Sequence, residues 1–296
     1  MKQLGRLLTA MVTPFDDKGA VNYEQAKKLA LALVNSGSDG VVVAATTGEA
    51  PTLSWEEEMR LFTEVKSAVG KRGTIIAYTG SNSTKEAVEN TEKAEKIGVD
   101  ACLSVVPYYN KPNQEGIYQH FKTIAENTSL PIIMYNIPSR VVIKMSLETI
   151  VRLSRIDNIV GVKEASSDME LVAQTLDNAS KDFLIWSGND NDTFHIMALG
   201  GYGTIGVATH LVGKQIKQMM DYILNSKIAE AAAIHRHLLP LVDALFIEPN
   251  PAPMKYALNH LGFKVGKPRL PLVEPSEKSA AIIIETLKKY KVDLKI

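Results

Sequence analysis

The chain has 296 residues, of which 45% are hydrophobic and 22% charged, values that are ordinary for a soluble globular protein with a large core. Its 33 basic residues balance 33 acidic ones, which argues against nucleic acid or an anionic membrane as the main partner and favours self-association. The one cysteine, Cys102, excludes an internal disulfide and is expected in the core. The basic start precedes a short apolar stretch that stops at Thr13-Pro14, and no stretch reaches the ~20 apolar residues of a membrane span, so we expect a cytoplasmic protein without a signal peptide.

Short apolar runs recur along the chain, and each is followed by an amphipathic stretch. Their starts lie roughly 20 to 35 residues apart, the length of a strand–helix unit. The predicted strands are Leu7–Val12, Gly40–Ala45, Thr74–Tyr78, Ala101–Val106, Ile132–Tyr135, Ile159–Lys163, Phe183–Trp186 and Thr204–Val207.

The stretches between these runs are predicted to be helices. Tyr23–Asn35 and Ser54–Val69 show apolar residues three to four apart. Ser54 with Glu57 three residues later is the pattern of a capping box, and Ser83 with Glu86 repeats it. After about residue 212 the strand signals stop, and helices are predicted near Lys214–Asn225, Ile228–Leu245, Pro253–Leu261 and Glu277–Tyr290.

Apolar strands that alternate with helices indicate a parallel sheet covered on both faces. Eight such units predict a closed (β/α)₈ TIM barrel. We assign the barrel and its active site to residues 1–225 and a C-terminal helical appendage to residues 226–296. An open doubly wound sheet is the alternative, although the glycine-rich turn of that fold is missing after the first run.

In such a barrel the active site lies where the strands end. Hydroxyls, phenols, one amine and one guanidinium follow the predicted strands there. They lie in residues 45–49 (Ala-Thr-Thr-Gly-Glu), 106–112 (Val-Pro-Tyr-Tyr-Asn-Lys-Pro), 135–140 (Tyr-Asn-Ile-Pro-Ser-Arg), 161–165 (Gly-Val-Lys-Glu-Ala) and 187–190 (Ser-Gly-Asn-Asp).

Lys163 carries the functional hypothesis. Strand side chains alternate between faces, so Gly161 and Lys163 share one face. If that face looks into the barrel, Gly161 leaves room beneath the lysine, and the poorly hydrated interior lowers the pKa of the amine. A neutral amine attacks a ketone to form an imine. The alternative is an ordinary strand-end lysine that reaches solvent or pairs with Glu164.

Neighbouring strand ends favour the chemical interpretation. Tyr135 lies one strand–helix unit before Lys163, and its phenol, linked to a hydroxyl of Thr46 or Thr47, is suited to the proton transfers of imine formation. Arg140 follows in a proline-containing loop and is suited to a bidentate grip on a carboxylate. Taken singly, each of these residues is also compatible with a packing or surface role.

Other patterns are weaker. The six histidines are scattered, and His235 and His237 diverge on a helix, so we expect no metal. Gly200, Gly201, Gly203 and Gly206 flank the eighth strand and suit either a phosphate site or tight turns. The pair Tyr108-Tyr109 suits a subunit contact.

With these residues the chain resembles the dihydrodipicolinate synthase / N-acetylneuraminate lyase family from Leu7 to about Leu272. Residues 40–49, residues 135–138 and residues 161–165 carry the resemblance. Thr46-Thr47, residues 108–112 and Ser139-Arg140 are similar to the synthase branch. One departure is Ala45, where the family usually has glycine.

The resemblance implies that pyruvate condenses with Lys163 and that the enamine attacks L-aspartate-4-semialdehyde to give 4-hydroxy-tetrahydrodipicolinate, the first committed step of the diaminopimelate route to lysine. It implies no metal and no organic cofactor. By position, the resemblance assigns a proton relay to Thr46, Tyr109 and Tyr135, the pyruvate carboxylate to Thr47, the semialdehyde carboxylate to Arg140, and the pocket lining to Gly188 and Ile205.

The resemblance also implies a homo-oligomer. The Tyr109 equivalent comes from a neighbouring subunit, so at least a dimer is expected, and a tetramer built as a dimer of tight dimers is usual. Many members are inhibited by lysine at a dimer-interface cleft. Asn82, Glu86 and Tyr108 match ligand positions of that cleft, whereas Ala50, Trp55 and Glu58 occupy more variable positions. Glu58 and Glu86 suit a cationic ligand there, or are ordinary solvated helix charges.

Three alternatives to this function stay open on the sequence. The first is another Schiff-base aldolase of the family that acts on a sugar acid or a hydroxy-oxo acid. The second is a non-catalytic barrel that senses a keto acid. The third, more distant, is a barrel that binds a phosphosugar.

Overall fold

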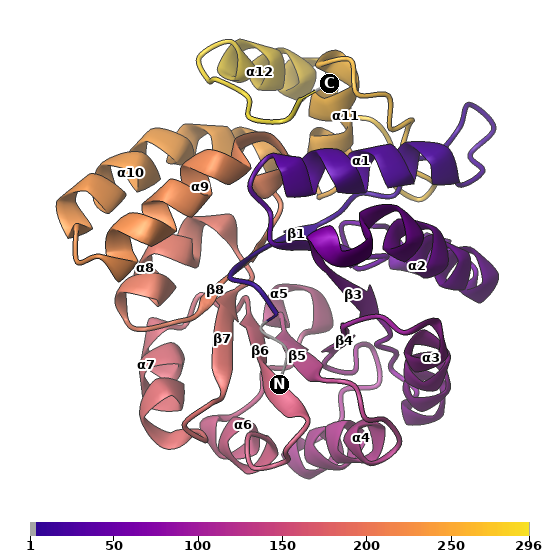
Figure 1. Ribbon diagram of the computed structural model, residues 1–296, viewed down its shortest axis with the longest axis vertical. Coiled ribbons are helices and arrows are strands. Elements are labelled where there is room, and N and C mark those ends of the chain that lie inside the picture. The colour runs from indigo at the N-terminus through magenta and orange to yellow at the C-terminus, as the bar shows by residue number, and fades with distance from the viewer. Residues whose placement is uncertain (1–3, 296) are drawn as a thin grey trace. The chain divides into compact units, whose positions relative to one another are not determined.

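The computed structural model describes residues 4–295. Within them, eight strands form a closed barrel in the order β1 to β8, and every strand pairing resolved residue by residue is parallel (Figure 1). The barrel prediction is therefore confirmed, and the open-sheet alternative is wrong. In the same residues, no helix is long and apolar enough to cross a membrane.

The described chain divides into two compact units. We call the first the central unit; it comprises Ile76–Ile205 and the segment up to Arg6. We call the second the terminal unit; it comprises Leu7–Ile75 and the chain from Gly206 onward. The boundary expected near residue 225 between barrel and appendage stays a prediction, and residues 1–3 and 296 lie outside the described part.

The central unit alternates strands with helices, as the apolar runs predict. Its strands are buried along almost their whole length because helices cover their outer face. Its elements are β3 (Thr74–Tyr78), which begins in the terminal unit, α3 (Thr84–Ile97), β4 (Ala101–Val105), α4 (Gln114–Glu126), β5 (Ile132–Asn136), α5 (Pro138–Val141), α6 (Leu147–Leu153), β6 (Ile159–Glu164), α7 (Met169–Asn178), β7 (Leu184–Ser187), the 3-10 turn η3 (Asp190–Asp192), α8 (Thr193–Ala198) and β8 (Gly203–Gly206), which ends in the terminal unit.

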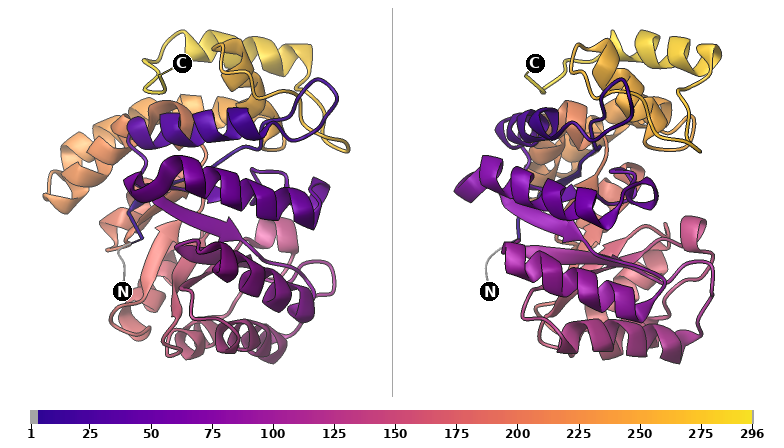
Figure 2. Two further views of the ribbon diagram at one scale, coloured as in Figure 1. Left: turned by 45° about the vertical axis from the view of Figure 1, so that its right-hand side comes forward. Right: turned by 90° about the vertical axis from the view of Figure 1, so that its right-hand side faces the viewer.

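The terminal unit holds the first two strands and the C-terminal helices. In Figure 2, α1 lies beside α2, and α9 lies beside α10. Its elements are β1 (Leu7–Ala10), α1 (Tyr23–Asn35), β2 (Gly40–Val43), η1 (Ala50–Thr52), α2 (Trp55–Val69), η2 (Gly70–Arg72), α9 (Thr209–Leu224), α10 (Ile228–Leu245), α11 (Ala252–His260) and α12 (Glu277–Leu287).

The helix-start predictions have two outcomes. At Ser54 the capping box is complete, because the hydroxyl accepts from the Glu57 N–H and the Glu57 carboxylate accepts from the Ser54 N–H. At Ser83 only the first half forms, since the hydroxyl accepts from the Glu86 N–H while the Glu86 carboxylate accepts from the Ser81 hydroxyl. The second predicted capping box is therefore an ordinary N-cap.

The predicted strand bounds agree with the observed ones to within two residues. The second strand ends at Val43 rather than Ala45, because Ala44 has a left-handed φ of 54° that turns the chain away from the sheet. Ala45 does not share that conformation and is buried, so its methyl group fits where the family usually has glycine. Cys102 is fully buried in β4, and burial raises the pKa of its thiol to about 12, which confirms the prediction of a core residue.

Candidate active site

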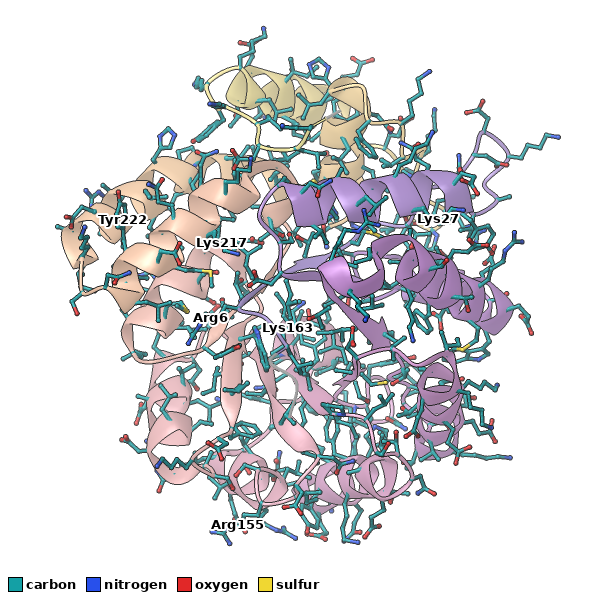
Figure 3. The ribbon with its side chains drawn as sticks, viewed as in Figure 1. Arg6, Lys27, Arg155, Lys163, Lys217 and Tyr222 are labelled. Atoms are coloured by element: carbon teal, nitrogen blue, oxygen red, sulfur yellow. The ribbon has the colours of Figure 1, made fainter. Side chains whose placement is uncertain are left out.

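Lys163 lies in β6, between β5 and β7. It is in register with Tyr135 of β5 on one side and with Trp186 of β7 on the other. Its Nζ lies 4.3 Å from the centre of the Tyr135 ring. Figure 3 shows Lys163 among the strands, whereas Arg155 points outward beyond α6. The aromatic ring of Tyr135 therefore lies against the amine of Lys163.

The amine of Lys163 is poorly hydrated, because the side chain is only 4% exposed. Burial lowers the pKa of Lys163 to about 7, the negative charge of Asp190 opposes that change, and the positive charge of Arg140 adds to it. The neutral form of the amine, which is the nucleophile, is therefore accessible near pH 7.

Glu164 points to the opposite face and has partners of its own. One carboxylate oxygen accepts from Asn136 Nδ2 at 2.8 Å, and the other accepts from the Ser166 N–H at 2.7 Å. The side-chain oxygen Oδ1 of Asn136 accepts in turn from the Met145 N–H at 3.2 Å. A lysine that reaches solvent or pairs with Glu164 is thus the wrong interpretation, because strand alternation separates the two side chains.

Two glycines shape the backbone around Lys163. A Cβ at Gly161 would lie 2.2 Å from the Leu184 carbonyl oxygen and 2.8 Å from the Trp186 ring, so the indole fills the room expected beneath the lysine. A Cβ at Gly188 would lie 2.7 Å from the Ala165 Cβ and 3.1 Å from Lys163 Cγ. Gly188 therefore lies against the lysine side chain, while Ile205, the other expected lining residue, is fully buried in β8.

The loop after β5 carries Arg140. Tyr135 is buried near the end of β5, and the short helix α5 follows Ile137 with Pro138 as its first residue. Proline is favoured there because the first residue of a helix has no intrahelical partner for an N–H, so the N–H that proline lacks costs no hydrogen bond. The positive charge of the exposed Arg140 contributes to lowering the pKa of Lys163, so it acts on the amine electrostatically.

The loop after β4 presents Tyr109. Its side chain is 89% exposed and its backbone has a φ of 73°, a conformation that a tyrosine rarely adopts. Asn110 fixes the loop by donating from Nδ2 to the Asn82 carbonyl oxygen at 2.8 Å. Tyr108, the preceding residue of the loop, is 39% exposed. The central unit thus holds Tyr109 out toward solvent, a position that suits a contact with another molecule.

Thr46 and Thr47 lie in the terminal unit, just after β2. Thr46 is half-buried and Thr47 is 3% exposed. The Thr13 hydroxyl donates to the Gly48 carbonyl oxygen at 2.6 Å, and Asn250 Nδ2 donates to Thr47 Oγ1 at 2.9 Å. The threonines therefore lie on a well-supported loop at the carboxyl end of a barrel strand, as expected.

The residues expected to bind lysine fall into two groups. In the central unit, Asn82 lies against the Tyr108–Asn110 loop, and the exposed Glu86 accepts from the Ser81 hydroxyl. In the terminal unit, Ala50 is in η1, and Trp55 and Glu58 are on α2. Glu58 is only 3% exposed, and burial raises the pKa of its carboxyl to about 9. It is therefore protonated at neutral pH in this chain, and the expected attraction of a cation by Glu58 has no charge to act through.

Residues beyond the sequence hypothesis also act on this site. Asp190 influences the pKa of Lys163 from η3, directly after β7. Because Asp190 follows a predicted strand, the sequence alone could have indicated it as a residue of the site. Asn136, which orients Glu164, and Asn250, which contacts Thr47 from 203 positions away, follow from no local pattern.

The weaker alternatives gain no support. Within residues 4–295, no group of three or more His, Cys, Asp or Glu side chains is placed to hold a metal. A Cβ at Gly203 would lie 2.0 Å from the Arg6 carbonyl oxygen, and one at Gly201 would lie 2.5 Å from the Ile196 side chain. These two glycines therefore serve close packing.

Comparison with known proteins identifies the family of this chain. A model of the Dihydrodipicolinate synthetase family matches residues 3–290. The chain belongs to this family. Among its relatives, the 4-hydroxy-tetrahydrodipicolinate synthase of Dehalococcoides mccartyi is 63% identical over 296 residues, which is 100% of both chains, and that of Moorella thermoacetica is 52% identical over 288 residues, which is 96% of this chain and 99% of the relative.

Solved structures of the family have the same fold. The dihydrodipicolinate synthase of Bacillus anthracis is 41% identical with a TM-score of 0.96, covering 98% of this chain and 99% of that one. The enzyme of Cyanidioschyzon merolae, solved with lysine bound, is 44% identical with a TM-score of 0.95, covering 97% and 98%. The family prediction is confirmed, and the chain is a lyase of the dihydrodipicolinate synthetase family.

Proposed function

We propose that this protein condenses pyruvate with L-aspartate-4-semialdehyde through an imine on Lys163, giving 4-hydroxy-tetrahydrodipicolinate. The observation that carries the proposal is the buried amine of Lys163, whose pKa is lowered to about 7, 4.3 Å from the Tyr135 ring. The names of the relatives supply the product, and the resemblance supplies the substrates.

The reaction needs a nucleophilic amine and a proton carrier. The Nζ lone pair forms a bond to C2 of pyruvate, and the carbonyl oxygen takes up protons and leaves as water. Loss of a proton from C3 gives an enamine, whose C3 bonds to the aldehyde carbon while the aldehyde oxygen gains a proton. The amino group of the semialdehyde then displaces Nζ from C2, which closes the ring and restores Lys163.

The remaining roles follow the positions of the residues. Tyr135, Thr46 and Tyr109 form the proton relay. Thr47 binds the pyruvate carboxylate, and Arg140 binds the carboxylate of the semialdehyde. Gly188 and Ile205 line the pocket; the contact of Gly188 with the Lys163 side chain supports this role.

Borohydride trapping with pyruvate tests the central step. Reduction of the imine leaves a stable pyruvate-derived adduct, which peptide mass spectrometry is expected to locate on Lys163. The purified protein is then assayed with L-aspartate-4-semialdehyde and, separately, with a sugar-acid substrate of the other family branch. If the adduct forms but only the sugar acid is turned over, the protein is an aldolase of the other family branch and the semialdehyde is not its substrate. If the folded protein forms no adduct, the keto-acid sensor is the better function.

The proposed function includes a homotetramer, built as a dimer of tight dimers, in the cytoplasm. The exposure of Tyr109, at 89%, supports a relay completed by a neighbouring copy of the chain. Enzymes of this family are cofactor-free, and we assign all the chemistry to side chains of the protein. Mixing Lys163→Ala protein with Tyr109→Phe protein tests the shared site, because a hybrid dimer then regains one intact site. Sedimentation analysis distinguishes dimer from tetramer.

Feedback by lysine is a second candidate function, and the lysine-bound relative from Cyanidioschyzon merolae favours it. We propose that lysine binds at Asn82, Glu86, Tyr108, Ala50, Trp55 and Glu58. Because Glu58 is protonated at neutral pH, we assign the charge contact to Glu86. Glu86→Gln is expected to abolish inhibition, whereas Glu58→Gln keeps it. Loss of inhibition in Glu58→Gln alone would contradict this assignment.

A further inference from the structure

The hydroxyl of Thr47 has a buried partner that belongs to no motif of the family resemblance. Asn250 Nδ2 donates to Thr47 Oγ1 at 2.9 Å, and the two residues are 6% and 3% exposed. Asn250 immediately precedes the segment that leads into α11. Because both groups are shielded from water, the direction of this hydrogen bond decides whether the Thr47 hydroxyl keeps its proton for donation to a third group.

The same C-terminal segment holds the far end of the threonine loop. Lys255 of α11 donates from Nζ to Glu49 Oε1 at 2.8 Å, and both side chains are fully buried. The other carboxylate oxygen of Glu49 accepts from the Arg269 N–H at 2.8 Å. Glu49 has a left-handed φ of 61°, a strained conformation that these contacts stabilise. The C-terminal segment therefore holds the threonine loop at two buried points, at Thr47 through Asn250 and at Glu49 through Lys255.

The amide group constrains the threonine proton. A threonine hydroxyl has one proton to donate and two lone pairs. An amide NH₂ group only donates, so Thr47 must act as acceptor toward Asn250. Its own proton is then left for another acceptor, and a carboxylate is the strongest one available to a buried hydroxyl.

We infer that Asn250 is a positioning residue for pyruvate, which turns the Thr47 hydroxyl so that its proton faces the carboxylate of the substrate. The inference rests on the proposed function, in which Thr47 binds that carboxylate. Asn250 acts through Thr47 and takes no part in moving protons during the reaction.

An isosteric substitution reverses the hydrogen bond. In Asn250→Asp the carboxylate only accepts, so the Thr47 hydroxyl donates to it and turns its lone pairs toward the substrate. We expect the pyruvate concentration that half-saturates borohydride trapping to rise by roughly 10- to 100-fold, the effect of losing a hydrogen bond to a charged group. Asn250→Ala removes the donor without adding charge and is expected to raise the same concentration by a smaller factor.

Two controls separate positioning from other effects. Asn259→Asp alters an asparagine of α11 that donates to the Gly266 carbonyl oxygen and leaves Thr47 untouched, so its half-saturation is expected to equal that of the wild type. In a Thr47→Val background the hydroxyl is gone, so most of the effect of Asn250→Asp should disappear.

The outcomes are distinct. If the wild-type protein gives no adduct, the proposed function fails rather than the role of Asn250. If the wild type is trapped and Asn250→Asp saturates at the same pyruvate concentration, the inference is overturned. An undiminished effect in the Thr47→Val background overturns it as well, since the introduced carboxylate would then act by charge alone. Should the aspartate variant not fold, Asn250→Ala decides in the same way.

Discussion

Two buried lysines, one in each unit, have different polar surroundings and, by our proposal, different roles. Lys163 and Lys255 are 4% and 0% exposed, and the Nζ atoms lie 4.3 Å from the Tyr135 ring and 4.0 Å from the Phe15 ring. In both, burial is the largest cause of a lowered pKa, to about 7 for Lys163 and about 8 for Lys255. Burial and an aromatic neighbour alone therefore do not make a lysine a nucleophile.

Their polar partners make the difference. Lys255 Nζ donates to Glu49 at 2.8 Å and to the Lys267 carbonyl oxygen at 3.0 Å, so two of its three protons are engaged and its charge is balanced by a carboxylate. The pKa of Lys163 is instead influenced by the charges of Asp190 and Arg140, which act in opposite directions. A buried lysine with a bonded carboxylate is a structural cation, whereas one between opposed charges stays available as an amine.

Removing the nucleophile is the change with the largest expected effect. Lys163→Ala should abolish the pyruvate adduct and lower turnover by about 10³-fold or more, the scale on which covalent nucleophiles act. The matched control is Lys255→Met, assayed where it is folded, which should still form the adduct on Lys163. A trapped adduct in Lys163→Ala would show that another residue is the nucleophile and would contradict the distinction between the two lysines.

Tyr135→Phe keeps the ring beside Lys163 and removes only the hydroxyl. We expect turnover to fall by about 10²-fold, the contribution of one general acid–base group, because protons must reach and leave the carbinolamine oxygen. Since the ring still shields the amine, the acid limb of the pH profile should stay in place. Steady-state kinetics measured across pH test both statements, and unchanged turnover would remove Tyr135 from the mechanism.

Lys255→Met should act on stability rather than on chemistry. The change leaves the Glu49 carboxylate buried without its cation, and breaking one side of a buried pair costs about 3–5 kcal/mol of unfolding free energy. Adding Glu49→Gln removes the stranded charge and should restore part of that loss. Urea unfolding of both variants measures the coupling. Equal stability of Lys255→Met and wild type would mean that the pair contributes nothing to the fold.

The two lysines also show what sequence patterns reveal. The barrel was predictable because its strands are apolar throughout and recur at the spacing of strand–helix units. Lys163 stood out because a charged residue interrupts such a strand at its carboxyl end, and Tyr135 lies one strand–helix unit earlier, near the end of the neighbouring strand. Lys255 gave no such signal, since a lysine in a helix normally lies at the surface.

Long-range polar contacts were beyond prediction for a related reason. Asn250 with Thr47 and Lys255 with Glu49 join residues more than 200 positions apart, and no period in the sequence reports such pairs. The burial of Glu58 was missed because its helix also carries the neighbouring charges Glu56 and Glu57, a pattern typical of a solvated face. Local rules predicted elements and faces, while the partners of buried charges follow only from the tertiary structure.

Removing the charges around Lys163 should give the smallest effect, a shift of the acid limb of the pH profile, with opposite directions for Arg140 and Asp190. Below the Lys163 pKa of about 7, the rate of trapping by pyruvate alone should fall about tenfold per pH unit, since only the neutral amine attacks. Arg140 lowers this pKa, so Arg140→Ala should raise it and move the acid limb to higher pH. Asp190 raises it, so Asp190→Asn should move the limb to lower pH.

Both displacements should be smaller than the effect of burial, which is the largest cause of the lowered pKa. Arg155→Ala is the matched control, because this exposed arginine is not among the charges that act on Lys163, and its limb should coincide with that of the wild type. Because the assay contains pyruvate but no semialdehyde, the proposed role of Arg140 in binding the semialdehyde does not affect the measured rate. Displacement of both limbs in one direction would show that the titrating group is not the amine, whereas opposite displacements would show that the charges around Lys163 set how much of it is nucleophilic.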